Sequence, residues 1–367
     1  MSLGGTDLSE LLVLWEELNR TSNQSQVELV VCSGAVGHAA LLHVLSVFYI
    51  FIFLAGLASN VLMIWVSLRR GGARSESRPY LLNLAAADLC VVLTLPFWVA
   101  SLLQGGLWPF GAALCKATHL MFGAGLLSSI LFLACLGVDA YLSVTLLAGA
   151  PSGRRRKLMR RLSCALLWLL ALAASIPEAY FLQAVRSPHR GGAVCRPVFP
   201  SENPRDGMVG VQVSFLVLGF VVPAPIITGS YLLLAAGLPP GSDQTRRLIR
   251  SYVVALAACW LPFHTVLLLD TLALLDALSF SCRLESFLLA ALPLTQCCSL
   301  LHCVLNPVLY CFLHRSRRHD LMEAFVFQYS TRTGLVRLMD ASQASDASAD
   351  QNRPVRSALQ DGAGADL

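Results

Sequence analysis

The segment Leu301-His302-Cys303-Val304-Leu305-Asn306-Pro307-Val308-Leu309-Tyr310 lies near the end of a long apolar run, and its Asn306, Pro307 and Tyr310 follow the spacing N-P-x-x-Y. A proline inside a helix removes one backbone hydrogen bond and kinks the helix. An amide and a phenol in lipid need hydrogen-bond partners within the protein. The three residues together predict a membrane helix that bends and re-pairs, which is the behaviour of a conformational switch.

The composition also indicates a membrane protein. The chain has 367 residues, of which 56% are hydrophobic and 13% are charged, whereas about 25% of the residues in a soluble protein are charged. Seven apolar runs are long enough to cross a bilayer. These predicted spans are Ala39–Leu68, Pro79–Leu103, Ala112–Leu147, Leu158–Leu182, Met208–Ala236, Leu248–Leu275 and Leu284–Leu313. We therefore expect an all-α membrane protein, a seven-transmembrane helix bundle over residues 39–313.

The distribution of basic residues predicts the orientation of the bundle. They cluster in three connections and directly after the last span, at Arg69–Arg78, Arg154–Arg161, Arg246–Arg250 and Arg315–Arg318. The positive-inside rule places these segments in the cytoplasm and the N-terminus outside. Two glycosylation acceptors, Asn19 and Asn23, would then both be extracellular.

Both ends of the chain are polar. Residues 1–38 form an acidic arm with Glu16, Glu17 and Glu28, and they lack the basic start and apolar core of a cleavable signal peptide. Residues 314–328 mix basic and apolar side chains, which predicts a short amphipathic eighth helix on the inner leaflet. The composition of residues 329–367 predicts a disordered cytoplasmic tail.

Three polar or aromatic features inside the spans each allow two interpretations. Asp88 costs about 2.5–3.5 kcal/mol in mid-bilayer, which favours a sodium or proton site over a merely satisfied core residue. Asp139-Ala140-Tyr141 ends the third span, and its spacing alone favours a solvated helix end. Trp260 and Pro262 are either a packed ring beside a tolerated kink, or a pair through which a ligand that presses on the ring rotates the inner half of the helix. Pro223 and Tyr231 repeat this combination of proline and polar residue in the fifth span.

Four cysteines, Cys32, Cys115, Cys195 and Cys282, lie outside the spans or at their ends and are disulfide candidates on an oxidising side. Four cysteines allow three pairings. A bridge between Cys115 and Cys195 would hold the longest extracellular loop over the mouth of the bundle, and is worth about 2–4 kcal/mol. A bridge between Cys32 and Cys282 would tie the N-terminus to the last extracellular loop.

No metal site and no catalytic site is predicted. His119 and His264 stand alone in their spans and are expected to pack or to line a pocket. His302 and Cys303 are adjacent, so we expect them to point in different directions on a helix. Neither H-E-x-x-H nor G-x-S-x-G occurs, and we do not expect an enzyme.

Taken together, these motifs resemble the rhodopsin-like G-protein-coupled receptors over nearly the whole of residues 39–327. The matching elements, in chain order, are Ser59-Asn60-Val61, Leu84-Ala85-Ala86-Ala87-Asp88, Cys115, Asp139-Ala140-Tyr141, Trp168, Pro223, Tyr231, Cys259-Trp260-Leu261-Pro262 and Asn306-Pro307-Val308-Leu309-Tyr310. Each motif is weak alone, but at least one per span in the correct order is very specific.

Within that family the chain resembles the chemokine-receptor group. The similarity is carried by Thr94-Leu95-Pro96-Phe97-Trp98, Trp108-Pro109-Phe110-Gly111, His302-Cys303-Val304-Leu305-Asn306-Pro307 and the additional pair Cys32 and Cys282. Leu300–Pro307 and Leu218–Pro223 are also similar to the atypical chemokine receptors, a branch of the group that includes an orphan receptor formerly described as adrenomedullin-receptor-like.

The resemblance implies a plasma-membrane receptor for basic, chemokine-like protein ligands. It implies a pocket lined by Trp98, His119, Trp260, His264, Asp270 and Gln296, with the acidic arm as the first docking site. It also implies an allosteric sodium ion at Asp88, Ser129 and Asn306. The implied switch residues are Asp139, Ala140, Tyr141, Tyr231, Trp260, Pro262, Asn306, Pro307 and Tyr310.

Two departures from the family pattern change the expected signalling. The family has Asp-Arg-Tyr where this chain has Asp139-Ala140-Tyr141, and an alanine methyl group can neither meet the tail of a G protein nor lock the resting state. We therefore expect weak or absent G-protein activation and a scavenger or decoy role. The acidic arm also has no tyrosine to be sulfated, which implies a broader ligand preference.

The tail fits such a role. Receptor kinases would phosphorylate Ser342, Ser345 and Ser348, which lie beside acidic residues, and arrestin would bind the resulting negative cluster and carry the ligand to endosomes. Three alternatives stay open: a conventional signalling peptide receptor, a transporter and a membrane enzyme. The sequence shows neither the repeated halves expected of many transporters nor a catalytic constellation.

Overall fold

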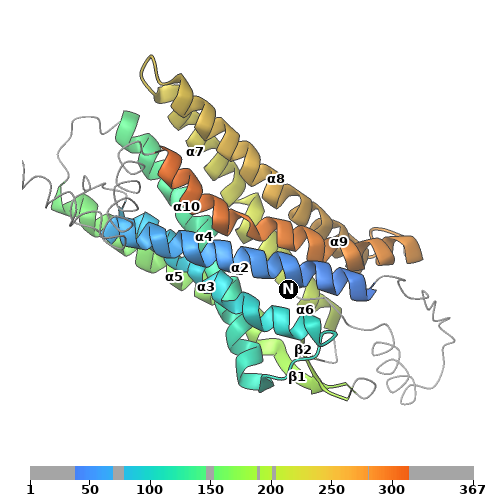
Figure 1. The fold of residues 1–367 in the computed structure, drawn as a ribbon. Helices are drawn as coiled ribbons and strands as arrows, with labels where there is room; N and C mark the ends of the chain where they lie inside the picture. Colours follow the sequence, from blue (N-terminus) through green and yellow to red (C-terminus); the bar gives the residue numbers. More distant parts are fainter. Residues whose placement is uncertain are drawn as a thin grey trace, which may run out of the picture. The chain divides into compact units, whose positions relative to one another are not determined.

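The structure is a computed structural model that describes residues 38–68, 78–145, 153–187, 191–200, 204–279 and 281–313. Its helices are α2 (His38–Leu68), α3 (Arg78–Leu103), α4 (Gly111–Thr145), α5 (Arg154–Phe181), α6 (Pro204–Leu216), the π-helix η1 (Val217–Val221), α7 (Pro223–Gly237), α8 (Asp243–Leu274), α9 (Cys282–Leu300) and α10 (His302–Leu313). An antiparallel hairpin, β1 (Leu182–Arg186) and β2 (Ala193–Pro197), pairs Ala184 with Cys195. Figure 1 shows the helices.

Seven helical segments in the described residues are long and apolar enough to cross a membrane, because α6, η1 and α7 form one span and α9 continues into α10. This confirms the predicted seven-transmembrane bundle. Large apolar side chains remain exposed on the outer faces of the helices, as Val47, Leu166 and Val254 do, each at 64–67% exposure. An exposed apolar surface of this extent is typical of contact with lipid rather than water.

Helix α4 lies at the centre of the bundle. Within its most apolar window 72% of the residues are buried, compared with 22–44% in the other six spans. It contacts α3, α5 and α7. Two glycines allow this close packing, because a Cβ at Gly125 would lie 2.9 Å from Cys90 Cβ, and one at Gly137 would lie 2.7 Å from Tyr231 Cε2.

The predicted boundaries differ from the observed ones where charged residues extend a helix past its apolar run. The fourth and sixth spans were expected to begin at Leu158 and Leu248, but α5 begins at Arg154 and α8 at Asp243. Lysine and arginine are good helix formers in water. The apolar pattern marks the part of a helix that fits the bilayer, not the whole helix.

Two predicted spans are interrupted in a way that hydropathy does not reveal. In the fifth span, the N–H of Val222 donates to the carbonyl of Val217 five residues back, directly before Pro223. In the seventh, α9 ends at Leu300 and α10 starts at His302, with tight hydrogen bonds around Leu301. Such irregular turns re-aim the side chains that follow them.

Candidate functional site

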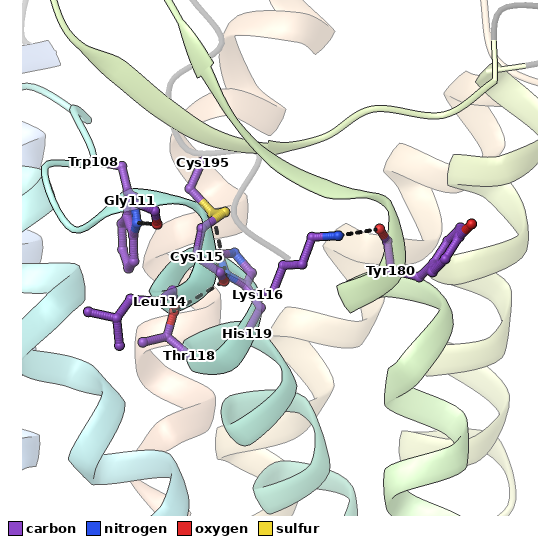
Figure 2. Close-up of a disulfide and its surroundings, with 9 residues drawn as sticks. All are labelled: Trp108, Gly111, Leu114, Cys115, Lys116, Thr118, His119, Tyr180 and Cys195. Atoms are coloured by element: carbon purple, nitrogen blue, oxygen red, sulfur yellow. Dashed lines mark hydrogen bonds between the residues drawn. A yellow bond between two sulfur atoms is a disulfide. The ribbon is translucent and has the colours of Figure 1, made fainter.

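A disulfide joins α4 to the hairpin, as Figure 2 shows. It links Cys115 to Cys195, with Cα atoms 5.7 Å apart and a sequence separation of 80 residues, which confirms this predicted pair. Cys282 is also disulfide-bonded. Its expected partner, Cys32, lies outside the described residues, so the second bridge stays a prediction.

The predicted pocket residues Trp98 and His119 lie together beneath this disulfide. Their rings are 4.5 Å apart, edge to face, and the ring of Trp108 lies 5.8 Å from that of Trp98. His119 Nδ1 donates to the carbonyl of Cys115 at 2.8 Å and lies 3.7 Å from Cys195 Sγ. Tryptophan and histidine thus form a rigid aromatic floor under the hairpin.

The surroundings of this floor are also fixed by hydrogen bonds (Figure 2). The indole N–H of Trp108 donates to the carbonyl of Gly111 at 3.0 Å, and Gly111 starts α4 with a φ of 79°. Only glycine adopts such a φ without strain. Lys116 donates to the carbonyl of Tyr180 at 3.1 Å, which ties α4 to α5 at the same end of the bundle.

A second group of predicted pocket residues lies on α8 and faces α6. The ring of His264 stacks on Phe220 at 4.5 Å and on Phe215 at 5.8 Å. Asp270 accepts a hydrogen bond from Gln212 Nε2 at 2.7 Å, and Gln212 Oε1 accepts one from Thr271 at 2.9 Å. Sequence reasoning missed Gln212, because an isolated glutamine in an apolar run carries no motif.

The last two predicted pocket residues, Trp260 and Gln296, belong to neither of these two groups. Trp260 is 4% exposed, and its ring lies 5.6 Å from that of His302. Gln296 is half-buried on α9. A cavity of about 120 Å³ lies between α7 and α8 and is lined by Trp260, Phe220 and Ile227 among others. Of the predicted pocket residues only Trp260 lines this cavity.

Asp88, Ser129 and Asn306 meet in the centre of the bundle, as the sequence predicted. Ser129 Oγ donates to Asp88 Oδ1 at 2.5 Å, and Asn306 Nδ2 donates to Asp88 Oδ2 at 3.0 Å. The amide oxygen of Asn306 accepts from the hydroxyl of Tyr252 at 2.8 Å. A sodium ion would find few free oxygens here, because Asn306 turns its nitrogen toward the carboxylate. The sodium site stays a prediction, and the hydrogen bonds among these side chains do not favour it.

The expectation that His302 and Cys303 point apart was wrong. His302 Nε2 lies 3.5 Å from Cys303 Sγ and 3.9 Å from Asp88 Oδ1. The rule for a regular helix does not apply here, because the tight turn at Leu301 separates α9 from α10 directly before this pair, and both side chains approach Asp88 of α3. The sequence motif identified the two residues but not this break.

Pro307 leaves one carbonyl of α10 without its usual donor, because proline has no N–H. The deprived group is the carbonyl of Cys303, four residues earlier. Asn60 Nδ2 of α2 donates to that oxygen at 2.9 Å and also to the carbonyl of Gly56 at 2.9 Å. The family motifs of the first and last spans therefore form one hydrogen-bonded unit.

Asp139 is not the solvated helix end that its spacing favoured. Its Oδ1 pairs with Arg160 Nε of α5 at 2.9 Å, and the side chains are 16% and 5% exposed. The prediction was wrong because the arginine comes from the basic run at the start of the fourth span, which served only to orient the bundle. Ala140 and Tyr141 are half-buried against the core.

The other predicted switch residues are placed as follows. Tyr231 is 3% exposed, and its ring lies 5.7 Å from that of Tyr252. Pro262 lies inside α8 and Pro307 inside α10. Tyr310 lies within α10, but its side chain is outside the described set.

Several predicted residues and segments lie wholly outside the described ranges. These are Glu16, Glu17, Glu28, Asn19, Asn23, Ser342, Ser345, Ser348, the amphipathic helix at residues 314–328 and the tail at 329–367. The predictions made for them stay predictions.

Comparison with known proteins agrees with this geometry. A family described as 7 transmembrane receptor (rhodopsin family) matches residues 59–310. Atypical chemokine receptor 3 of Homo sapiens is 45% identical over 324 residues, which cover 87% of this chain and 89% of the relative. G-protein coupled receptor 182 of Homo sapiens is 36% identical over 85% of this chain and 76% of the relative.

C-X-C chemokine receptor type 4 of Xenopus tropicalis is 34% identical, over 76% of this chain and 77% of the relative. These matches confirm the resemblance to the chemokine-receptor group and its atypical members. The match covers every span, from Ser59 in α2 to Tyr310 in α10. The chain therefore belongs to the rhodopsin family of seven-transmembrane receptors.

Proposed function

We propose that the chain is a plasma-membrane receptor that binds basic, chemokine-like proteins from outside and carries them into endosomes, with weak or no activation of G proteins. The names of two relatives, an atypical chemokine receptor and a C-X-C chemokine receptor, support the ligand class. The observation that carries the signalling part of the proposal is Ala140, together with the ion pair beside it.

The ion pair shows how the inner end of α4 in this chain differs from that of a family member with arginine at the position of Ala140. The carboxylate of Asp139 is directed sideways to Arg160 of α5, and both side chains are largely buried. Ala140 offers no hydrogen-bond donor, whereas an arginine offers five in a rigid fork. In this proposal the inner end of α4 stays locked to α5 and presents no cation to a G-protein tail.

The ligand would enter at the end of the bundle that holds the hairpin. There the disulfide holds the hairpin, and the half-buried ring of Trp98 packs on the buried ring of His119. Asp270 supplies negative charge at the side of α8. The acidic arm predicted from the sequence would attract a basic protein before it reaches this end of the bundle.

Internalisation would depend on the tail. Phosphate groups on Ser342, Ser345 and Ser348 would add three strongly negative groups beside Asp346 and Asp350. Arrestin is the partner that such a cluster would recruit after receptor kinases act. Removal of all three serines by alanine substitution is then expected to reduce ligand uptake without reducing ligand binding at the surface.

The proposal is tested in cells that express the full chain. Labelled chemokines and basic control peptides are added, and uptake is measured beside G-protein dissociation. We expect uptake of some chemokines without dissociation. We expect Ala140→Arg to raise dissociation and Ala140→Leu, which adds bulk but no charge, to leave it unchanged. Strong dissociation with the unaltered chain would contradict the signalling part, and absence of uptake for every chemokine would contradict the scavenging part.

The family match favours one second candidate, a conventional peptide receptor that signals through heterotrimeric G proteins. In that case a transducer would have to bind the inner end without the arginine of the family motif. The same assay separates the two functions, because the second predicts ligand-driven dissociation that Ala140→Arg does not increase.

A further inference from the structure

Three side chains with metal-binding atoms converge in the centre of the bundle. Asp88 comes from α3, and His302 and Cys303 come from the first turn of α10. All three are 0% exposed. A carboxylate oxygen, the imidazole nitrogen and the thiol sulfur all lie within 4.8 Å of one another. The tight turn at Leu301 lies directly before His302 and Cys303.

The hydrogen bonding of His302 leaves one ring nitrogen available. His302 Nδ1 lies 2.6 Å from the carbonyl of Ser299, and a carbonyl can only accept, so Nδ1 carries the proton. In neutral imidazole Nε2 then presents a lone pair, and it faces Asp88 Oδ1 and Cys303 Sγ. A backbone carbonyl on the second nitrogen is the usual outer partner of a metal-binding histidine.

Two of the three separations between these atoms can be compared with the edges of a tetrahedral zinc site. With Zn–N of about 2.05 Å, Zn–S of about 2.3 Å and Zn–O of about 2.1 Å, tetrahedral angles require roughly 3.5 Å between N and S and roughly 3.4 Å between N and O. The observed distances are 3.5 Å from His302 Nε2 to Cys303 Sγ and 3.9 Å from His302 Nε2 to Asp88 Oδ1. A shift of about 0.5 Å in one side chain closes the site.

The donor types favour zinc over a hard cation. Sodium, magnesium and calcium prefer oxygen ligands, whereas zinc accepts imidazole nitrogen and thiolate sulfur. Among the neighbouring side chains, Asn306 turns its nitrogen toward Asp88, and its oxygen is engaged by Tyr252. Nitrogen and sulfur therefore lie where a hard-ion site would need oxygen.

Charge balance points the same way. One Zn²⁺ with the Asp88 carboxylate and the Cys303 thiolate makes a neutral unit, which suits a site with no exposure to water. On binding, the thiol of Cys303 releases its proton to solvent as the Zn–S bond forms. Ser129 Oγ, which already donates to Asp88, offers a neutral oxygen for the fourth position.

We propose that Asp88, His302 and Cys303 bind Zn²⁺ and thereby staple α3 to α10. The site is independent of the proposed ligand and of G-protein coupling. Because any rearrangement of the last span moves α10 relative to α3, bound zinc stabilises the arrangement seen here.

The test uses the full chain, purified in detergent with a tag that contains no histidine and stripped of metal with a chelator. Zinc chloride is added, excess ion is removed by desalting, and zinc per chain is measured by elemental analysis. Thermal unfolding is followed in parallel with added zinc chloride, or with sodium chloride against a bulky organic cation at equal ionic strength. We expect one zinc per chain and a raised unfolding midpoint that sodium does not reproduce.

Matched variants locate the ion. Cys303→Ala and His302→Asn should each weaken zinc binding by at least about tenfold, whereas Cys297→Ala, at a buried cysteine of α9, should not. Cobalt in place of zinc should give a thiolate-to-metal absorption band that disappears only in Cys303→Ala. Less than one zinc in the unaltered chain, equal zinc in all variants, or stabilisation by sodium alone would each overturn the proposal. The first and third results need no variant, so a variant that fails to fold leaves the test intact.

Discussion

The ion pair between Asp139 and Arg160 gives a sharp test of how the inner end of α4 is held. Arg160 Nε and Asp139 Oδ1 are 2.9 Å apart, and the arginine is the more buried partner, at 5% exposure against 16%. At an effective dielectric constant of about 20 the attraction is roughly 6 kcal/mol, and desolvation of the two ions offsets most of it. The net value of the pair is therefore small, but the loss of one partner is costly.

The two single substitutions should differ because the partners differ in burial. Asp139→Ala deprives a guanidinium held at 5% exposure of this carboxylate, and we expect a loss of about 3 kcal/mol, the low end for buried pairs. Arg160→Leu removes the more buried charge and should cost about 1.5 kcal/mol. The double variant should lose about 2 kcal/mol of stability. This is roughly 2.5 kcal/mol less than the sum of the two single losses, and that difference is the coupling energy of the pair.

Thermal unfolding of the purified chain in detergent measures these differences. At about 2–4 °C per kcal/mol, Asp139→Ala should lower the midpoint by roughly 6–12 °C and Arg160→Leu by about half as much. Arg161→Leu, at an exposed neighbour of the same run, should change it by less than about 2 °C. Strictly additive effects, or an equal loss in Arg161→Leu, would refute the view that this pair locks α4 to α5.

Three further outcomes are expected. Cys195→Ser opens a bridge that spans 80 residues, and should lower stability by about 2–4 kcal/mol in non-reducing thermal unfolding; an unchanged midpoint would contradict this. Gly137→Ala places a Cβ 2.7 Å from Tyr231 Cε2, and should cost about 1–3 kcal/mol by overpacking, measured in the same way, whereas Gly229→Ala meets open space and should cost less than 1 kcal/mol. The hydrogen bond from Arg205 lowers the pKa of Asp276, so its stabilising effect is full above the ordinary pKa of about 4 and fades as the pH falls below it. The midpoints of Asp276→Asn and the unaltered chain should therefore differ slightly at pH 7 and converge as the pH falls below the lowered pKa of Asp276; a difference that grows with acid would contradict the sign.

The fold could be predicted from sequence because its determinants are local and repeated. Runs of apolar residues longer than a bilayer give the spans without knowledge of contacts. The family resemblance also implied that Asp88, Ser129 and Asn306 share one site, and their side chains are hydrogen-bonded to one another. Buried polar groups in apolar spans must find partners within the bundle, and here the family resemblance indicated which residues those partners are.

What the sequence did not reveal depends on irregular backbone or on contacts between distant segments. Hydropathy is the same for a helix with or without a break, so the turn at Leu301 and the π-turn at Val217–Val221 were missed. The convergence of His302 and Cys303 on Asp88 was not predicted either. Gln212 and Arg160 were missed because their partners lie 58 and 21 residues away, and neither residue belongs to a recognised motif.

The bond from Asn60 to the carbonyl of Cys303 has a mechanical consequence. A proline bend is usually pictured as a free hinge, but here the carbonyl oxygen that loses its helical donor at the bend is held by the first membrane helix. If the inner half of α10 swung alone, that oxygen would face hydrocarbon with no donor, at a cost of roughly 1–3 kcal/mol. The last helix must therefore either carry α2 with it or admit a water molecule into the gap, and the rate of either event limits how fast the bend can open.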